Sequence, residues 1–372
     1  MLHRISALAL VLILSSACTT AAMQPVDPPV VPGETWAYWD SPQAAGFDAD
    51  GLDAVRASLD SLPSIGMMVV RGGRVAFEHG NVDTLSYVAS VRKSILAMLY
   101  GTYVEDGTID LSRTLEDLEM NDVQGLTEAE QQATIEHLIT ARSGVYHPAS
   151  NPGDNLSDAP ARGSQAPGSY FLYSNWDFNA AGTAFELTTD LNIFNALEAD
   201  LARPLGFQDW NRFIHGKSGD TSRSRYPAYH MTFSTRDMAR LGLLMLREGR
   251  WGDEQVIPGD WARWIVSLTT PIEEMNPADL RDEWFGYGAM WWVFDGAAAE
   301  GAYEGAYSAR GAYGQYITVL PKLDLVVAHK TLPAPFGSME EYDQISVNWP
   351  EFHGILDGLV AAYCGNTCGE GE

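Results

Sequence analysis

The chain has 372 residues, of which 23 are basic and 49 acidic, and its formal net charge is −26 at pH 7. A charge of this sign and size repels nucleic-acid phosphates and anionic lipid head groups, so nucleic acid is excluded as an expected partner. Hydrophobic residues make up 46% of the chain and charged residues 19%, which is typical of a folded globular protein rather than a disordered one. The length fits one large domain or two closely packed lobes.

The N-terminus has the pattern of a secretory signal peptide. A basic start at residues 3–4 precedes an apolar run at residues 7–14, and this run is too short for a membrane-spanning helix. We therefore expect residues 1–18 to be a signal peptide and the protein to be exported, with a periplasmic location. Residues 19–34 are rich in proline and small residues, a composition typical of a linker.

Cys18 closes the sequence SSAC, which resembles a bacterial lipobox. In such a signal the cysteine becomes the acylated first residue of the mature protein, so we expect a lipid anchor at Cys18 that holds the protein to an envelope membrane. Ser15 stands where an aliphatic residue is more usual, and cleavage after Ala17 or Ala22 without lipid is the alternative.

The other two cysteines, Cys364 and Cys368, lie four residues apart in the C-terminal tail, residues 363–372. In an exported protein this spacing favours a small disulfide loop. No histidine or third cysteine stands near them in the sequence to complete a zinc site. We therefore expect neither a metal nor a cofactor.

Apolar patterns place strands at both ends of the chain and helices in the middle. Residues 47–62 predict a helix capped by Asp48 or Asp50, and residues 65–81 predict a hairpin that turns at Gly72-Gly73. The later part of the chain has a helical pattern at 259–268, strand-like runs at 287–295, 313–321 and 323–331, and a final helix at 349–363.

Between these ends, residues 106–254 have mainly helical spacing, with apolar residues three and four apart. This order predicts one α/β lobe, formed by residues 35–105 and 255–362, that carries an inserted helical lobe. The cleft between the lobes is then the expected site.

Ser90 and Lys93 form an S-x-x-K motif in the sequence YVASVRKS, just ahead of an apolar run. Residues three apart share one face of a helix, so a serine in the first turn can touch a lysine one turn later. The positive end of the helix dipole favours negative charge that develops at the serine. Lys93 can act as a base only when it is neutral, which requires its pKa to fall from about 10.4 through burial or nearby positive charge. An ordinary helix start with two polar residues is the competing interpretation.

Two later segments supply partners for this pair. PGSYFLYSN contains Tyr173 and Asn175, a phenol and an amide two residues apart. SARGAYGQYITVL places Gly311 in a strand whose backbone N–H groups could face a reacting carbonyl.

With these motifs in this order, the sequence resembles the serine β-lactamase and penicillin-binding-protein superfamily. Within it the sequence is most similar to class C β-lactamase-related hydrolases, which include family VIII-type esterases, D-aminopeptidases and 6-aminohexanoate-dimer hydrolases. Residues 133–145, 203–207 and 231–246 are also similar to family segments. The resemblance covers residues 36–361 and implies an α/β (α+β) fold, in which helices flank an antiparallel sheet and a mainly helical lobe is inserted.

The resemblance also implies an activity: a serine hydrolase that cleaves an ester or an amide of a small molecule through an acyl-Ser90 intermediate. Lys93 and Tyr173 would share the proton transfers, and which of them is the base in each step stays open. Asn175 would bind Lys93 or the substrate, with a purely structural amide as the alternative.

The oxyanion hole would consist of the backbone amides of Ser90 and of Ala312, which follows Gly311 on the strand. His230 would contact the substrate from the border of the cleft, with a structural histidine as the alternative. Other candidates for the pocket lining, for which a place in the core is the favoured interpretation, are Tyr287, Trp291, Trp292, Tyr313 and Gln315.

The sequence departs from true β-lactamases at their K-T-G box, whose lysine helps to hold the substrate carboxylate. Aligning Gly311 with that glycine puts Ala309 at the lysine position, and strand alternation predicts that Arg310 points to the other face. Lys330 precedes a threonine but lies at the end of the next predicted strand, so we interpret it as unrelated to the box. We therefore expect a simple ester or amide as substrate. The alternatives are a D-amino-acid peptidase, a weak β-lactamase and, outside the enzymes, a receptor for peptidoglycan fragments.

Overall fold

A seven-stranded antiparallel sheet organises the computed structural model, which describes residues 30–332 and 345–365. Its strand order is β2-β1-β13-β12-β11-β10-β9. Because β1 pairs with β13, segments from the two ends of the chain meet in the centre of one sheet. The strands are β1 (Gly66–Arg71), β2 (Arg74–Gly80), β9 (Phe285–Tyr287), β10 (Trp292–Phe294), β11 (Tyr307–Gly311), β12 (Gln315–Leu320) and β13 (Leu325–Lys330).

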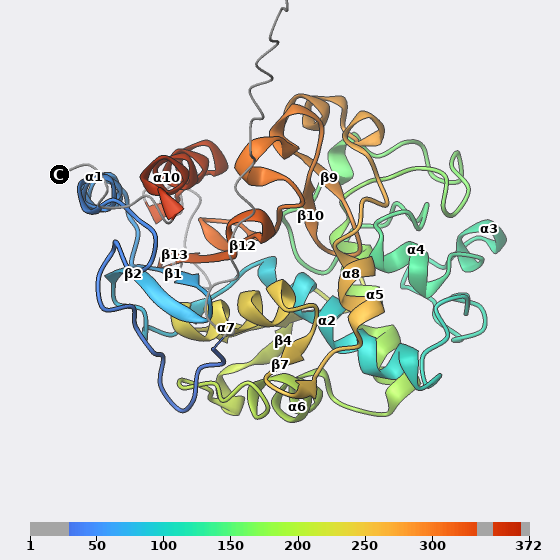
Figure 1. Cartoon of the computed structure of the whole chain (residues 1–372). Helices are drawn as coiled ribbons and strands as arrows, with labels where there is room; N and C mark the ends of the chain where they lie inside the picture. Colours follow the sequence, from blue (N-terminus) through green and yellow to red (C-terminus); the bar gives the residue numbers. More distant parts are fainter. Residues whose placement is uncertain (1–29, 333–344, 366–372) are drawn as a thin grey trace, which may run out of the picture.

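Helices cover both faces of this sheet, and Figure 1 shows α1 and α10 together on one side and α7 on the other. The outer pair is α1 (Ala49–Asp60) and α10 (Trp349–Ala362), whereas α7 (Thr235–Leu246) packs against β1, β12 and β13. The strands β1, β12 and β13 are consequently buried at every position. The predicted fold, an antiparallel sheet flanked by helices, is confirmed.

Local sequence signals explain the first elements. Asp48 caps α1 by accepting a hydrogen bond from the amide of Gly51 at 2.8 Å, and the apolar residues of α1 face α10. The hairpin between β1 and β2 turns at Gly72 and Gly73, whose φ angles of 59° and 78° suit glycine. The predicted first helix and hairpin are therefore both confirmed.

The middle of the chain forms the helical part, which is on the right in Figure 1. The central helix α2 (Val91–Glu105) contacts helices of this part and also β11 of the sheet, so α2 joins the two parts of the molecule. The other α-helices in the described middle part and just after it are α3 (Glu128–Gln131), α4 (Ile135–Ile139), α5 (Asn175–Thr189), α6 (Ile193–Leu197) and α8 (Gly259–Ile265). Short two-stranded pairs join β3 (Ser86–Tyr87) to β6 (Thr232–Phe233), β4 (Gly216–Ser218) to β5 (Ala228–His230) and β7 (Arg250–Trp251) to β8 (Glu254–Gln255).

Two details differ from the expectation. The prediction of a single strand at residues 287–295 is wrong. These residues contain the end of β9 and the whole of β10, and the two strands pair with each other. The turn between them includes Met290, which has a φ of 59°. The unbroken apolar sequence conceals this turn, because Met290 and Trp291 are themselves buried. In addition, α7 lies within the residues expected for the helical lobe, 106–254, but packs on the sheet.

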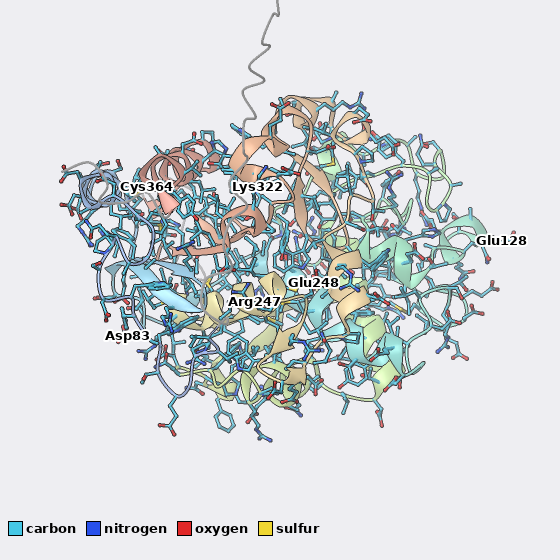
Figure 2. The ribbon with its side chains drawn as sticks, in the orientation of Figure 1. Asp83, Glu128, Arg247, Glu248, Lys322 and Cys364 are labelled. Atoms are coloured by element: carbon cyan, nitrogen blue, oxygen red, sulfur yellow. The ribbon has the colours of Figure 1, made fainter. Side chains whose placement is uncertain are left out.

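The predictions of export, of a lipid anchor and of a disulfide concern residues at the two ends of the chain. The predicted signal peptide, the lipid-anchor candidate Cys18 and residues 19–29 of the predicted linker lie outside the described residues. Cys364 lies beside α10 (Figure 2) and is disulfide-bonded, while its predicted partner Cys368 also lies outside the described residues. Within residues 30–332 and 345–365, no helix is long and apolar enough to cross a membrane.

Candidate active site

Ser90 lies at the point where the chain leaves β3 and enters α2. The preceding residue, Ala89, has a φ of 47°, an uncommon conformation for a residue with a side chain. Ser90 is the N-cap residue of α2, and its carbonyl accepts the amide hydrogen bond of Lys93 at 3.0 Å. The first turn of the helix therefore brings Ser90 and Lys93 to one side, with Ser90 half-buried and Lys93 only 2% exposed.

Lys93 is held at the centre of the site by two oxygen atoms. Its Nζ lies 2.6 Å from Tyr173 Oη and 2.6 Å from Asn175 Oδ1, and it also sits 4.5 Å from the ring centre of Phe178. Burial lowers the pKa of Lys93 well below its ordinary value, and the positive charge of neighbouring Arg92 lowers it further, whereas Asp154 acts in the opposite direction. A lysine in this environment can be neutral and can accept a proton.

Tyr173 contacts Lys93 and lies near Ser90. It immediately precedes the N-cap of α5, its phenol oxygen accepts a hydrogen bond from Lys93 Nζ, and it lines the same cavity as Ser90. Burial raises the pKa of Tyr173 to about 12, although the nearby Ser90 hydroxyl opposes this shift. The phenol ring packs against the rings of Phe178 and Trp292, with centre-to-centre distances of 4.9 and 5.4 Å. Tyr173 is thus a protonated phenol in a fixed position between the serine and the lysine.

Asn175 orients Lys93 from the first turn of α5. Its Oδ1 accepts from Lys93, while its Nδ2 donates to the Pro152 carbonyl at 2.8 Å. Its backbone amide donates to Asp154 Oδ2 at 3.2 Å. The amide is therefore tied both to the lysine and to the loop at 152–154, which connects the site to the helical part.

The end of β11 lies against the start of α2. A Cβ placed on Gly311 would lie 2.5 Å from the Val88 carbonyl oxygen and 3.2 Å from the Ser90 amide nitrogen, so only glycine fits without displacement of the backbone. Ala312 is the first residue of the turn between β11 and β12, in which Tyr313 has a φ of 70°. The backbone of Gly311 is thereby placed beside the Ser90 amide.

A cavity of about 480 Å³ opens over Ser90 and Tyr173. Its lining combines the loop at 153–155, the end of β11, the β11–β12 turn and the residues that lead into α10. Gly311 and Ala312, predicted for the oxyanion side, are among the lining residues. The full lining is Ser90, Gly153, Asp154, Asn155, Tyr173, Trp292, Arg310, Gly311, Ala312, Tyr313, Tyr316, Ser346, Val347 and Asn348.

The structure does not bring every candidate into this cavity. His230 lies outside its lining: one ring nitrogen is 2.7 Å from Ser218 Oγ and the other 3.2 Å from Tyr87 Oη, and burial lowers the His230 pKa to about 4. A substrate contact for His230 stays a prediction. Of the other lining candidates, Trp292 and Tyr313 line the cavity, whereas Tyr287, Trp291 and Gln315 are buried outside its lining.

Lys330 is separate from the site, as its position in the sequence indicated. It is fully buried and donates hydrogen bonds to the carbonyls of Ser86 and Phe233. Burial lowers its pKa to about 7. It does not line the Ser90 cavity, and Ala309, at the position of the β-lactamase lysine, is fully buried.

The sequence did not single out Asp154, Arg310, Tyr316 or residues 346–348 as lining residues. Asp154 lies in a loop that the sequence marks only as rich in Gly, Pro and Asn. Residues 346–348 reach the site through the Val347 amide, which donates to the Tyr313 carbonyl at 3.3 Å. No sequence signal could have found this contact, because it joins two loops through the tertiary fold.

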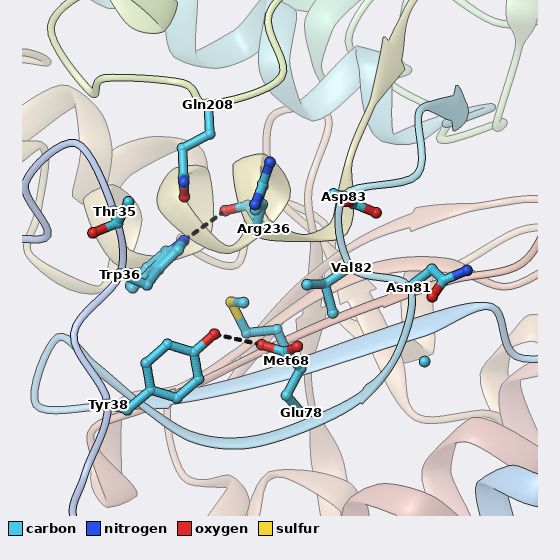
Figure 3. Close-up of a pocket in the computed structure, with 11 residues that line it drawn as sticks. Thr35, Trp36, Tyr38, Met68, Glu78, Asn81, Val82, Asp83, Gln208 and Arg236 are labelled. Atoms are coloured by element: carbon cyan, nitrogen blue, oxygen red, sulfur yellow. Dashed lines mark hydrogen bonds between the residues drawn. The ribbon is translucent and has the colours of Figure 1, made fainter.

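A second cavity, of about 390 Å³, lies between the N-terminal segment, β1–β2 and α7 (Figure 3). Two of its polar side chains are hydrogen-bonded: the Tyr38 hydroxyl donates to Glu78 at 2.8 Å, and Trp36 Nε1 donates to the Arg236 carbonyl at 3.3 Å. The Arg236 guanidinium is paired with Asp209 at 2.6 Å. Its lining contains no serine or lysine, so the Ser90 cavity is the candidate for acyl-transfer chemistry.

The described part of the chain contains no cluster of side chains suited to bind a metal ion. Residues 30–332 and 345–365 contain no group of three or more His, Cys, Asp or Glu side chains that could hold a metal ion.

The antiparallel sheet, its helices on both faces and the serine-bearing helix packed against β11 define a β-lactamase-like fold. The chain belongs to the β-lactamase family, whose pattern it matches over residues 52–331. The resemblance to the β-lactamase superfamily that the sequence motifs indicated is therefore confirmed.

Solved structures agree with this assignment at low sequence identity. A putative β-lactamase from Bacteroides dorei is 18% identical, with a TM-score of 0.62 and coverage of 85% of this chain and 99% of that one. A putative 6-aminohexanoate-dimer hydrolase from Bacillus anthracis is 18% identical, with a TM-score of 0.57 and coverage of 82% and 79%. EstCE1, a hydrolase with promiscuous acyltransferase activity, is 17% identical, with a TM-score of 0.57 and coverage of 86% and 99%.

Proposed function

We propose that the protein is a serine acyl hydrolase that cleaves an ester or an amide through an acyl-Ser90 intermediate. The observation that carries this proposal is the grouping of Ser90, Tyr173 and Lys93 at one cavity, in which the phenol lies near the serine hydroxyl and 2.6 Å from a lysine whose pKa burial lowers. A structural role would not require a nucleophile, a relay and a neutralised base to lie together.

In the acylation step, the Ser90 hydroxyl oxygen attacks the carbonyl carbon. Its proton passes to Tyr173 while the phenol proton passes to neutral Lys93, so Tyr173 remains a phenol throughout. The backbone amides of Ser90 and Ala312 stabilise the oxyanion. When the tetrahedral intermediate collapses, the bond to the alcohol or amine breaks, and the leaving group takes the proton back from Lys93 through Tyr173.

Deacylation repeats the same proton transfers with water in place of the serine hydroxyl. Water loses a proton through Tyr173 to Lys93 and attacks the acyl carbon, after which Ser90 leaves and recovers the proton. Asn175 keeps Lys93 in place during both steps through its Oδ1. Neither step requires a metal or a cofactor.

The proposal includes an exported location and a lipid anchor at Cys18, both of which rest on the N-terminal sequence pattern. A radiolabelled or alkyne-tagged fatty acid incorporated by a bacterial host into the wild type but not into Cys18→Ser tests the anchor. Equal labelling of both proteins, or of neither, would contradict it.

The enzymatic proposal is tested by turnover of p-nitrophenyl butyrate and by labelling with a fluorophosphonate probe. We expect the wild type to hydrolyse the ester and to be labelled, and Ser90→Ala to do neither while it keeps the far-UV circular dichroism spectrum of the wild type. Equal turnover by both proteins would exclude Ser90 as the nucleophile. A stable penicillin adduct without turnover of any ester or amide would support the receptor alternative.

A further inference from the structure

We propose that Arg310 binds a carboxylate of the substrate, so that the preferred substrates are esters or amides carrying one negative charge. This inference rests on the proposed acyl-hydrolase function and adds the chemical class of the substrate. It follows from the position, the partners and the charge environment of the Arg310 side chain.

Three aromatic rings fix the position of the Arg310 guanidinium. Its central carbon lies 4.5 Å from the ring centre of Phe285, 4.6 Å from that of Trp292 and 4.9 Å from that of Trp349. Phe285 belongs to the core on the α1–α10 side of the sheet, so Arg310 lies on the face that strand alternation predicts. Its side chain nevertheless lines the Ser90 cavity. The expectation that this face lies away from the site was incomplete, because the cavity reaches around the end of β11.

The guanidinium is only partly satisfied by the protein. The carboxylate of Glu283 lies 3.7 Å from Nη1, which is too long for a hydrogen bond. Among the described residues, Nη1 has no hydrogen-bond partner although it is buried. The planar guanidinium can donate two parallel hydrogen bonds to a carboxylate, whereas the aromatic rings around it accept none of this kind. Nη1 is closed off from solvent, so a substrate carboxylate would instead pair with Nε and Nη2, which have no hydrogen-bond partner among the described residues.

The charge of the cavity supports the same conclusion. Arg310 is the only cationic side chain among the described residues that line it, and Asp154 is the only anionic one. The two oxygens of Asp154 accept hydrogen bonds from the amides of Asn175 and Leu156, at 3.2 and 3.4 Å. In a protein with a net charge of −26, a recessed and incompletely paired guanidinium is a specific attraction for an anion.

The other lining residues indicate the chemical character of the substrate segment between its carboxylate and its scissile bond. The rings of Tyr173, Trp292 and Tyr316 line the cavity around Arg310. Such surfaces favour an apolar acyl chain or leaving group between the reacting carbonyl and the charged end. The two sides of the scissile bond are distinguished by experiment.

The test compares matched charged and neutral substrates. On the acyl side, p-nitrophenyl hydrogen adipate is compared with p-nitrophenyl methyl adipate. On the leaving-group side, 4-carboxyphenyl butyrate is compared with its methyl ester. For at least one pair we expect the wild type to prefer the anionic substrate by about tenfold in kcat/KM, the size of effect that a charge-assisted hydrogen-bond pair gives. No preference in either pair would overturn the proposal.

The substitutions Arg310→Gln and Arg310→Lys separate recognition from structure. We expect Arg310→Gln to bring the ratio of kcat/KM for the charged and neutral substrates to about one, whatever its effect on either rate alone, and Arg310→Lys to keep part of the preference. Arg263→Gln, which removes an exposed arginine far from the cavity lining, should keep the full preference. An undiminished preference in Arg310→Gln would contradict the assignment.

A measurement on the wild type alone covers the case in which the Arg310 variants do not fold. Hexanoate should inhibit hydrolysis of the neutral ester competitively, about tenfold more strongly than hexanamide. Equal inhibition by the two compounds would overturn the carboxylate proposal. Failure of the proposed function is distinguishable, because the neutral substrates would then also be stable and Ser90→Ala would behave as the wild type.

Discussion

The Nζ of Lys93 lies 2.6 Å from the phenol oxygen of Tyr173, although 80 residues separate them in the chain. Both side chains are buried, with exposed fractions of 2% and 8%. Burial moves their pKa values in opposite directions relative to ordinary lysine and tyrosine: downward for Lys93 and upward, to about 12, for Tyr173. The contact therefore favours two neutral groups, which is the state in which a proton can pass between them without separated charges.

The pH dependence of catalysis follows from this contact. Lys93 must lose its proton before it can accept the proton of Ser90, so kcat/KM should rise with pH. Because burial lowers the Lys93 pKa, the midpoint of the rise should lie well below 10.5, the ordinary lysine value. Tyr173, with a pKa of about 12, should cause no fall in rate up to about pH 10. A pH profile with p-nitrophenyl butyrate checks this, and a midpoint near 10.5 would be inconsistent with a buried lysine base.

Two substitutions should move that midpoint in opposite directions. The positive charge of Arg92 lowers the pKa of Lys93, and the negative charge of Asp154 raises it. Arg92→Met should therefore shift the rising limb to higher pH, and Asp154→Asn should shift it to lower pH. The midpoint is independent of the concentration of folded enzyme, so partial destabilisation does not confuse the comparison. Shifts of the same sign in both variants would contradict the electrostatic account.

Gly311→Ala should reduce catalysis more than stability. The new Cβ would meet the Val88 carbonyl at 2.5 Å and would push β11 away from the Ser90 amide. Displacement of one oxyanion donor is expected to lower kcat by about 10²-fold. Gly354→Ala is the matched control, because a Cβ there meets nothing within 4 Å. Steady-state kinetics together with a urea titration separates the two effects, and wild-type kcat in Gly311→Ala would argue against this oxyanion hole.

Asp122→Asn should destabilise the helical part. The Asp122 carboxylate accepts hydrogen bonds from Trp176 Nε1 at 2.7 Å, from Ser224 Oγ at 2.7 Å and from the Arg225 amide at 2.8 Å. Burial alone would raise the Asp122 pKa, but these hydrogen bonds hold it below its ordinary value. An asparagine presents one acceptor oxygen and a donor that opposes these donors, so we expect a loss of about 2 kcal/mol in the free energy of unfolding.

The same group makes stability depend on acid. A carboxylate whose pKa is lowered by folding contributes stability above its unfolded pKa, and this contribution is lost as the pH falls through the folded value. The difference in unfolding free energy between wild type and Asp122→Asn should therefore shrink as the pH is lowered below about 4. Asp53→Asn, on the exposed side of α1, is the control. An equal effect of both substitutions on the urea midpoint would refute the structural role of Asp122.

Much of the fold could be predicted because its signals are local. Asp48 caps α1, the Gly72-Gly73 pair turns the first hairpin, and residues 349–362 carry the apolar spacing of α10. The break between β9 and β10 could not be predicted, because its turn residues are apolar and buried by tertiary packing. The packing of α7 on the sheet was likewise hidden, since an apolar helical face does not state which partner covers it.

The candidate site likewise contains residues that local motifs predict and one, Arg310, whose place in the cavity they do not predict. Ser90, Lys93, Tyr173 and Asn175 are recognisable from motifs. The structure places Lys93 in contact with Tyr173 and Asn175, and Ser90 lines the same cavity as Tyr173. Arg310 was placed on the far face by strand alternation, a local rule that says nothing about where a cavity ends.

Trapping the acyl-enzyme tests the central claim most directly. A slowly deacylating p-nitrophenyl ester is mixed with the protein, the reaction is quenched in acid, and peptides are mapped by mass spectrometry. We predict a stoichiometric burst of p-nitrophenol in the wild type, with the acyl mass on the peptide that contains Ser90, and no burst or adduct in Ser90→Ala. A burst of equal size in Ser90→Ala, or an acyl group on any other residue, would contradict the account.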